Sequence, residues 1–97
     1  MTNFIVVGNI SGENIISDCF VLHNNEKPVV LESLEDTVES LVVALQYDCK
    51  DYTIIEHVFE ENSVIAITSC NTEIQYKIVA MDGSDVIAKE LLIKHIC

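Results

Sequence analysis

Residues 33–47, SLEDTVESLVVALQY, decide the fold, because their apolar side chains recur at helical spacing. Ser33 is a suitable N-cap residue, and Asp36 stands three positions later, as in a variant of the capping box. Glu35 and Asp36 fall in the first turn, where the positive end of the helix dipole favours carboxylates. The pattern predicts a helix over residues 34–47. One stripe of this helix carries Leu34, Val38, Leu41, Val42 and Leu45.

Runs that are typical of β-strands flank this helix on both sides. Short clusters of Asn, Gly, Ser and charged residues separate the runs and supply turns. The last run alternates cleanly and places Ile74, Tyr76 and Ile78 on one face. The predicted runs cover residues 3–10, 15–23 and 28–31 before the helix, and 52–60, 63–70 and 73–81 after it.

The C-terminal segment predicts a second helix over residues 85–96. Ser84 is its candidate N-cap, and Glu90 and Lys94 stand four residues apart, as ion pairs on helices do. Apolar residues occupy most of the circumference of this helix. Such a helix is either deeply buried or covered by a partner.

The predicted element order is βββα followed by βββα, in a single domain over residues 1–97. This order predicts the α+β class, a small antiparallel sheet with two helices packed on it. The halves have similar lengths, and Cys19 and Cys70 each fall in a second strand. Two interpretations stay open, an internal duplication or a chance alignment of two ordinary α+β stretches.

The charge balance excludes some classes of partner. The 97 residues include 16 acids and five lysines but no arginine, which gives a net charge of −11, and 49% of the chain is apolar. Such a chain repels nucleic acids and anionic membranes, so we expect neither as a direct partner. We expect a cytoplasmic protein, without a targeting segment, that buries part of its apolar surface in a homodimer.

No arrangement of residues points to catalysis. Cys19 and His23 stand four residues apart on a strand, which is a weak signal for a nucleophile or a zinc site, and we expect the cysteines to be small buried thiols. Glu56 and His57 are neighbours on a strand and point to opposite faces. No phosphate-binding glycine loop occurs. We therefore predict a protein that is not an enzyme and that has no metal site or cofactor.

The acids gather on surfaces that suit a basic protein partner. The predicted function is an inhibitor or decoy that occupies the basic surface of a nucleic-acid-handling protein. Phage anti-restriction and anti-CRISPR inhibitors and the immunity proteins of nuclease toxins have a similar size and charge, and a chain without arginine fits the AT-rich genomes of many phages. The predicted partner-binding residues are Glu32, Glu35, Asp36 and Glu39 with Val43 and Tyr47 as anchors, and a second acidic patch of Glu56, Glu60 and Glu61.

Three other interpretations of the same residues stay open. The outer face of the first helix fits an ordinary solvated exterior, because charged outer faces are routine. The chain also fits a small-ligand-binding or sponge protein that uses Tyr52, Tyr76 and His57. It fits, finally, a non-catalytic subunit of a larger assembly.

Overall fold

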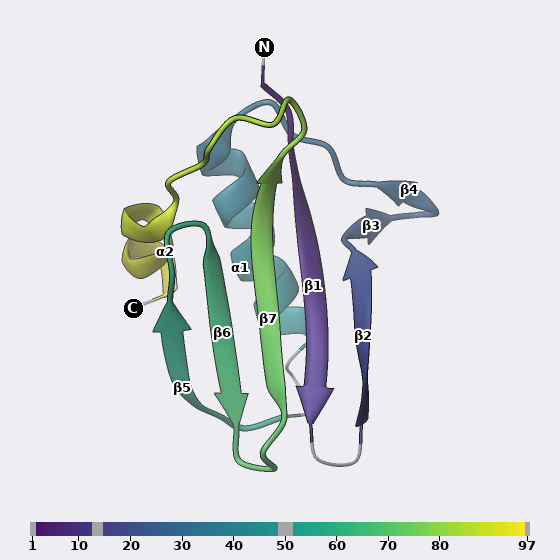
Figure 1. Cartoon of the computed structure of the whole chain (residues 1–97), viewed down its shortest axis with the longest axis vertical. Coiled ribbons are helices and arrows are strands. Elements are labelled where there is room, and N and C mark those ends of the chain that lie inside the picture. Colours follow the sequence, from purple (N-terminus) through teal and green to yellow (C-terminus); the bar gives the residue numbers. More distant parts are fainter. Residues whose placement is uncertain (1, 13–14, 49–51, 97) are drawn as a thin grey trace.

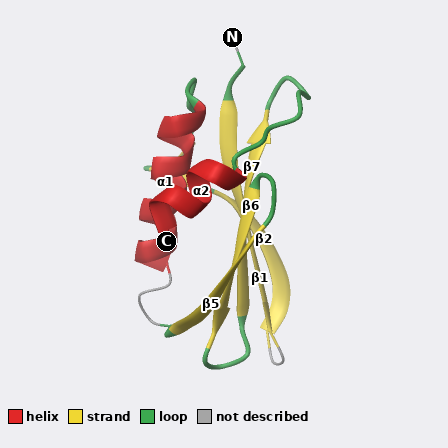
Figure 2. Cartoon of the chain, turned by 90° about the vertical axis from the view of Figure 1, so that its left-hand side faces the viewer, coloured by secondary structure: helices red, strands yellow, loops and turns green. Residues whose placement is uncertain are grey.

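A computed structural model describes residues 2–12, 15–48 and 52–96 of the chain. Its centre is a five-stranded sheet in the order β2–β1–β7–β6–β5, in which every neighbouring pair is antiparallel (Figure 1). Both helices cover the same face of this sheet, and the described residues leave its other face uncovered (Figure 2). The elements are β1 (Phe4–Gly12), β2 (Ile15–Val21), α1 (Leu34–Asp48), β5 (Ile54–Phe59), β6 (Ser63–Thr68), β7 (Glu73–Ala80) and α2 (Lys89–Ile96).

The two halves of the chain are joined by β1 and β7, which are the first and last strands along the sequence and lie side by side inside the sheet. β1 pairs with β7 from Phe4 opposite Ala80 to Ser11 opposite Glu73. The predicted α+β class and the two helices are confirmed, whereas the βββα repeat is matched only in part. In the first half, a small separate hairpin of β3 (His23–Asn24) and β4 (Lys27–Pro28) follows β2.

This hairpin has a local cause. Asn25 and Glu26 both adopt positive φ angles, 54° and 67°, which is the geometry of a tight type I′ turn. Pro28 has no N–H to donate to a longer ladder. The predicted strand 28–31 therefore does not extend the sheet as a full strand, and beyond β4 it contributes an isolated bridge between Leu31 and Phe4.

The helix α1 forms as predicted. The backbone N–H of Asp36 donates to Ser33 Oγ at 3.4 Å, which confirms the N-cap. Val38, Leu41 and Leu45 are buried, and α1 packs against β1, β7 and α2. The sheet side of this core comes mainly from alternate residues of β7, as the sequence predicts: Ile74, Tyr76, Ile78 and Ala80.

The helix α2 begins at Lys89, so the predicted start at residue 85 is wrong. Ser84 does not cap it, because Ser84 lies five residues before Lys89. Its backbone N–H donates to Asp82 Oδ1 at 2.8 Å. Val86 and Ala88 are buried with the exposed Ile87 between them, and the Ala88 N–H donates to the Glu61 carbonyl at 2.5 Å. Residues 85–88 are therefore extended and bind the turn after β5.

Candidate functional site

A groove of about 660 Å³ lies between the outer face of α1 and the β3–β4 hairpin. The hairpin projects from the sheet just after β2 (Figure 1). Its position is fixed by backbone hydrogen bonds from Leu22 N–H to the Val6 carbonyl and from Val29 N–H to the Leu22 carbonyl, both 2.9 Å long. We call this feature the helix–hairpin groove. Its lining residues are Asp36, Glu39, Ser40, Val43, Ala44 and Tyr47 of α1 and, on the hairpin side, Leu22, His23, Asn24 and Val29.

The helix–hairpin groove brings together four of the residues predicted to bind a partner. Asp36, Glu39, Val43 and Tyr47 follow one another at spacings of three or four residues, which places them along one side of α1. Val43 is 64% exposed and Tyr47 is 69% exposed, although both side chains are large and apolar or aromatic. The arrangement sets two carboxylates beside two apolar anchors on one wall.

Two other predicted residues, Glu32 and Glu35, are exposed but do not line the groove. Glu32 precedes α1, and Glu35 lies in its first turn. Both add negative potential near the N-terminal end of α1 without forming part of the groove wall.

Sequence reasoning missed the hairpin wall. Leu22 and Val29 contribute apolar surface, and His23 turns its Nδ1 towards the Val21 carbonyl, with which it forms a hydrogen bond. The sequence predicts a turn at residues 24–27, because Asn tolerates the positive φ that a tight hairpin needs, but it gives no signal that this hairpin lies beside α1.

The second predicted patch is divided between a strand and a turn. Glu56 is exposed on β5 and pairs with Ile67 of β6. Glu60 and Glu61 are exposed in the turn that follows, where Glu60 accepts a hydrogen bond from the Ser63 hydroxyl at 3.3 Å.

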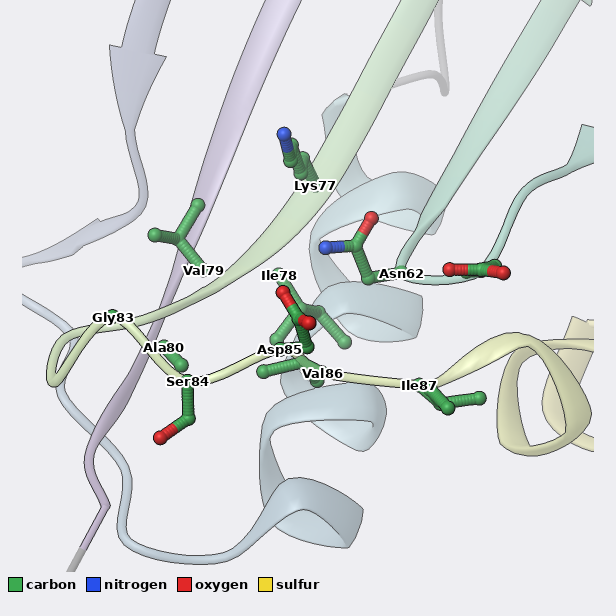
Figure 3. Close-up of a pocket in the computed structure, with 11 residues that line it drawn as sticks. Asn62, Lys77, Ile78, Val79, Ala80, Gly83, Ser84, Asp85, Val86 and Ile87 are labelled. Atoms are coloured by element: carbon green, nitrogen blue, oxygen red, sulfur yellow. The ribbon is translucent and has the colours of Figure 1, made fainter.

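A second cavity, of about 430 Å³, lies where residues 83–87 cross the end of β7 (Figure 3). Lys77 and Asp85 both line it, as does Glu61. Two acids against one lysine make it a poor host for an anionic ligand such as a nucleotide. This cavity lends no support to the small-ligand interpretation.

The ligand-binding residues of that interpretation are not brought together. Tyr76 is completely buried, so it cannot contact a ligand and that prediction is wrong. Tyr52 is half-buried and lines none of the three cavities described for residues 2–12, 15–48 and 52–96. His57 lines a small cavity of about 150 Å³ between β5 and the helices, together with His95.

The cysteine and histidine candidates form no metal site in the described part of the chain, where no group of three or more His, Cys, Asp or Glu side chains could hold a metal ion. Cys19 and Cys70 are exposed, so the expectation of buried thiols is wrong for both. The Thr68 and Thr72 hydroxyls lie 3.2 and 3.4 Å from Cys70 Sγ, and these hydrogen bonds lower the pKa of the thiol. The other two cysteines, Cys49 and Cys97, lie outside the described residues.

The burial of His57 predicts that the stability of the fold depends on pH. Its Nε2 is buried without a hydrogen-bond partner among the described residues, and burial lowers its pKa from the ordinary 6.5. The neutral ring is thus favoured in the folded state. Its contribution to the stability of the fold is complete above pH 6.5 and is lost as the pH falls through the folded-state pKa. We expect His57→Leu to flatten the pH dependence below 6.5 and, by removing an unsatisfied nitrogen, to stabilise the fold by about 1 kcal/mol.

Urea unfolding at a series of pH values measures this effect. The matched control is His23→Leu, which removes a histidine from the exposed hairpin and leaves the surroundings of His57 unchanged. An unchanged slope in His57→Leu would contradict the assignment.

Neither a search of the described part of the chain for membrane-spanning helices nor a comparison with known proteins gives a match. None of the helices in the described residues is long and apolar enough to span a bilayer. No protein-family model, curated protein or solved structure matches the chain.

Proposed function

We propose that this chain is a protein–protein interaction module that holds a basic partner in the helix–hairpin groove. The observation that carries the proposal is the joint lining of one groove by Asp36 and Glu39, which are acidic, and by Val43 and Tyr47, which are exposed apolar anchors. Binding energy at interfaces concentrates in such anchors, and surrounding charges set orientation and specificity.

The chemistry of the groove defines the partner segment. A lysine or arginine of the partner pairs with Asp36 or Glu39, and an apolar or aromatic side chain next to it packs on Val43 and Tyr47. The net charge of −11 adds long-range attraction, which raises the association rate with a cationic surface and falls with added salt.

The biological role follows from the partner surface. Basic protein surfaces that attract carboxylates are commonly those that neutralise phosphates. By occupying such a surface, the chain acts as an inhibitor or decoy that excludes nucleic acid from its binding site. The effect is competition for a surface and requires no chemical step.

Charge reversal inside and outside the groove tests the proposal. The variant Asp36→Lys/Glu39→Lys and the control Asp85→Lys/Glu90→Lys both raise the net charge from −11 to −7. They are matched further, because Asp36 and Glu90 each lie in the first turn of a helix. We expect the groove variant to slow association with proteins captured by the wild-type chain from host extract by about 10–100-fold, whereas the control slows it only slightly.

The measurement is surface-based kinetics with each captured protein after its purification, at low and moderate salt. Duplex DNA should compete with the wild-type chain for the same partner if the occupied surface binds nucleic acid. Equal association rates for the two variants would reject the groove, and binding that DNA leaves unaffected would reject the inhibitor role.

A further inference from the structure

The face of the sheet opposite the helices is not covered by any described element (Figure 2). It carries apolar side chains together with polar ones such as Asn9, Ser11 and Gln75. The strand registers identify its side chains, because Val7 pairs with Val21 and Lys77, while the alternate residues Val6 and Ile78 are buried on the helix side. We call this surface the open face. Its apolar members are all β-branched: Ile5, Val7, Val21, Val58, Ile65, Ile67 and Val79.

We propose that the open face is the interface of a homodimer, in which two copies of the sheet pack face to face as a sandwich. β-Branched side chains on a pleated surface are the usual filling between two packed sheets, which lie about 10 Å apart. The same patch on both copies is then self-complementary, as a two-fold interface requires.

The charge distribution identifies a second copy as the occupant. The chain has a net charge of −11, yet the described strand residues of the open face include only Glu56, Glu73 and Lys77 as ionised groups. Glu61 and Asp85 lie at one end of this face, in the cavity that Lys77 and Val79 also line. Two copies therefore meet there with little repulsion, whereas a basic partner would find few carboxylates to pair with.

The register also gives charge complementarity between two copies. Gln75 and Ile65 belong to a middle row, with Lys77 one row to one side and Glu73 one row to the other. Antiparallel stacking about this middle row sets the lysine of each copy over the acidic row of the other.

The size of the open face fits a modest dimer interface. Five strands at about 4.8 Å spacing, over about six residues each, give a footprint of about 24 by 20 Å. The accessible surface of a pleated face exceeds its footprint, so the pair buries about 1,200 Å² in total, the lower end for specific complexes. The dimer should therefore dissociate within an accessible concentration range.

Dimerisation through this face leaves the helix–hairpin grooves free. α1 lies on the other side of the sheet, so the two grooves point outward from the sandwich (Figure 2). A bivalent module binds a partner with two basic sites, or two partners on one assembly, more tightly than either groove alone. The dimer rests on the open face and not on the proposed function of the groove.

Sedimentation equilibrium of the full chain and two matched variants tests the dimer. Ile65→Lys places a charge in the middle of the open face, and Val43→Lys makes the same change of charge on α1, where Val43 is 64% exposed. We expect the wild type and Val43→Lys to approach twice 10.8 kDa as concentration rises, and Ile65→Lys to dissociate at least about 100-fold more readily. Circular dichroism checks that both variants are folded.

The rate at which Cys19 is alkylated gives a second measurement, and it needs no substitution in the interface. The backbone of Cys19 pairs with Asn9, which places it in the middle row of the open face, whereas Cys70 lies in the exposed turn between β6 and β7. In a Cys49→Ser/Cys97→Ser background, alkylation of Cys19 should slow relative to Cys70 as the protein is concentrated. A wild type that stays monomeric, an Ile65→Lys variant that dimerises like the wild type, or a Cys19 rate independent of concentration would each overturn the proposal.

Discussion

Replacing Leu41 with alanine should lower the free energy of unfolding by about 2–5 kcal/mol. Leu41 is completely buried in the middle of α1, and this helix packs against β1, β7 and α2. The loss combines the transfer free energy of the removed methyl groups with the cavity that they leave. Because small domains are stable by only about 5–15 kcal/mol, this single change removes a large share of the total.

The Leu41→Ala substitution should affect the helix–hairpin groove as well as the core. α1 carries one whole wall of the helix–hairpin groove, and its inward side chains hold that wall against the sheet. Val43→Ala is the matched control, since Val43 is 64% exposed on the opposite side of the same helix and should cost less than about 0.5 kcal/mol. Urea unfolding measures both variants. A similar cost for the two would show that α1 is not anchored as described.

The contrast between α1 and α2 shows which local signals are sufficient for prediction. In α1 the apolar period, the cap at Ser33 and the acids of the first turn all indicate the same boundary, and the helix begins there. In the C-terminal segment the candidate cap, Ser84, lies five residues before α2, and its backbone N–H donates to Asp82 Oδ1. Residues 85–88 then bind the turn at Glu61, which is distant in sequence, and tertiary contact decides the start of α2.

The same distinction applies to the groove. Its helical wall was predictable, because Asp36, Glu39, Val43 and Tyr47 share one side of a helix whose phase is set by the buried stripe. The hairpin wall was not, because it depends on how Leu22 and Val29 are held beside β1 by backbone hydrogen bonds. Tyr76 was assigned to the right face of β7, yet its role as a ligand contact fails because α1 and Phe20 leave it no exposed surface.

The pairing of β1 with β2 depends on the absence of a side chain at Gly8. Gly8 stands opposite Phe20 of β2 and Tyr76 of β7, and a Cβ added to it would lie 2.3 Å from Phe20 Cζ. The Phe20 ring thus lies across the glycine and meets Tyr76 edge-on, with 5.9 Å between ring centroids and an angle of 83° between the ring planes. This is aromatic coverage of a strand glycine, which fixes the register of β2.

Gly8→Ala is therefore expected to destabilise the fold by about 1–3 kcal/mol, because the Phe20 ring must move and lose its contact with Tyr76. The φ angle of Gly8 is not positive, so the backbone itself accepts alanine and the cost is steric. In a Phe20→Ala background the obstruction is gone. There, Gly8→Ala should be neutral or stabilising by about 0.5–1 kcal/mol, since alanine restricts the unfolded chain more than glycine does. A double-mutant cycle by urea unfolding measures the coupling. Additive effects would mean that Phe20 does not cover Gly8, and the edge strand β2, with the hairpin and the groove wall that follow it, would then be held in place by other contacts.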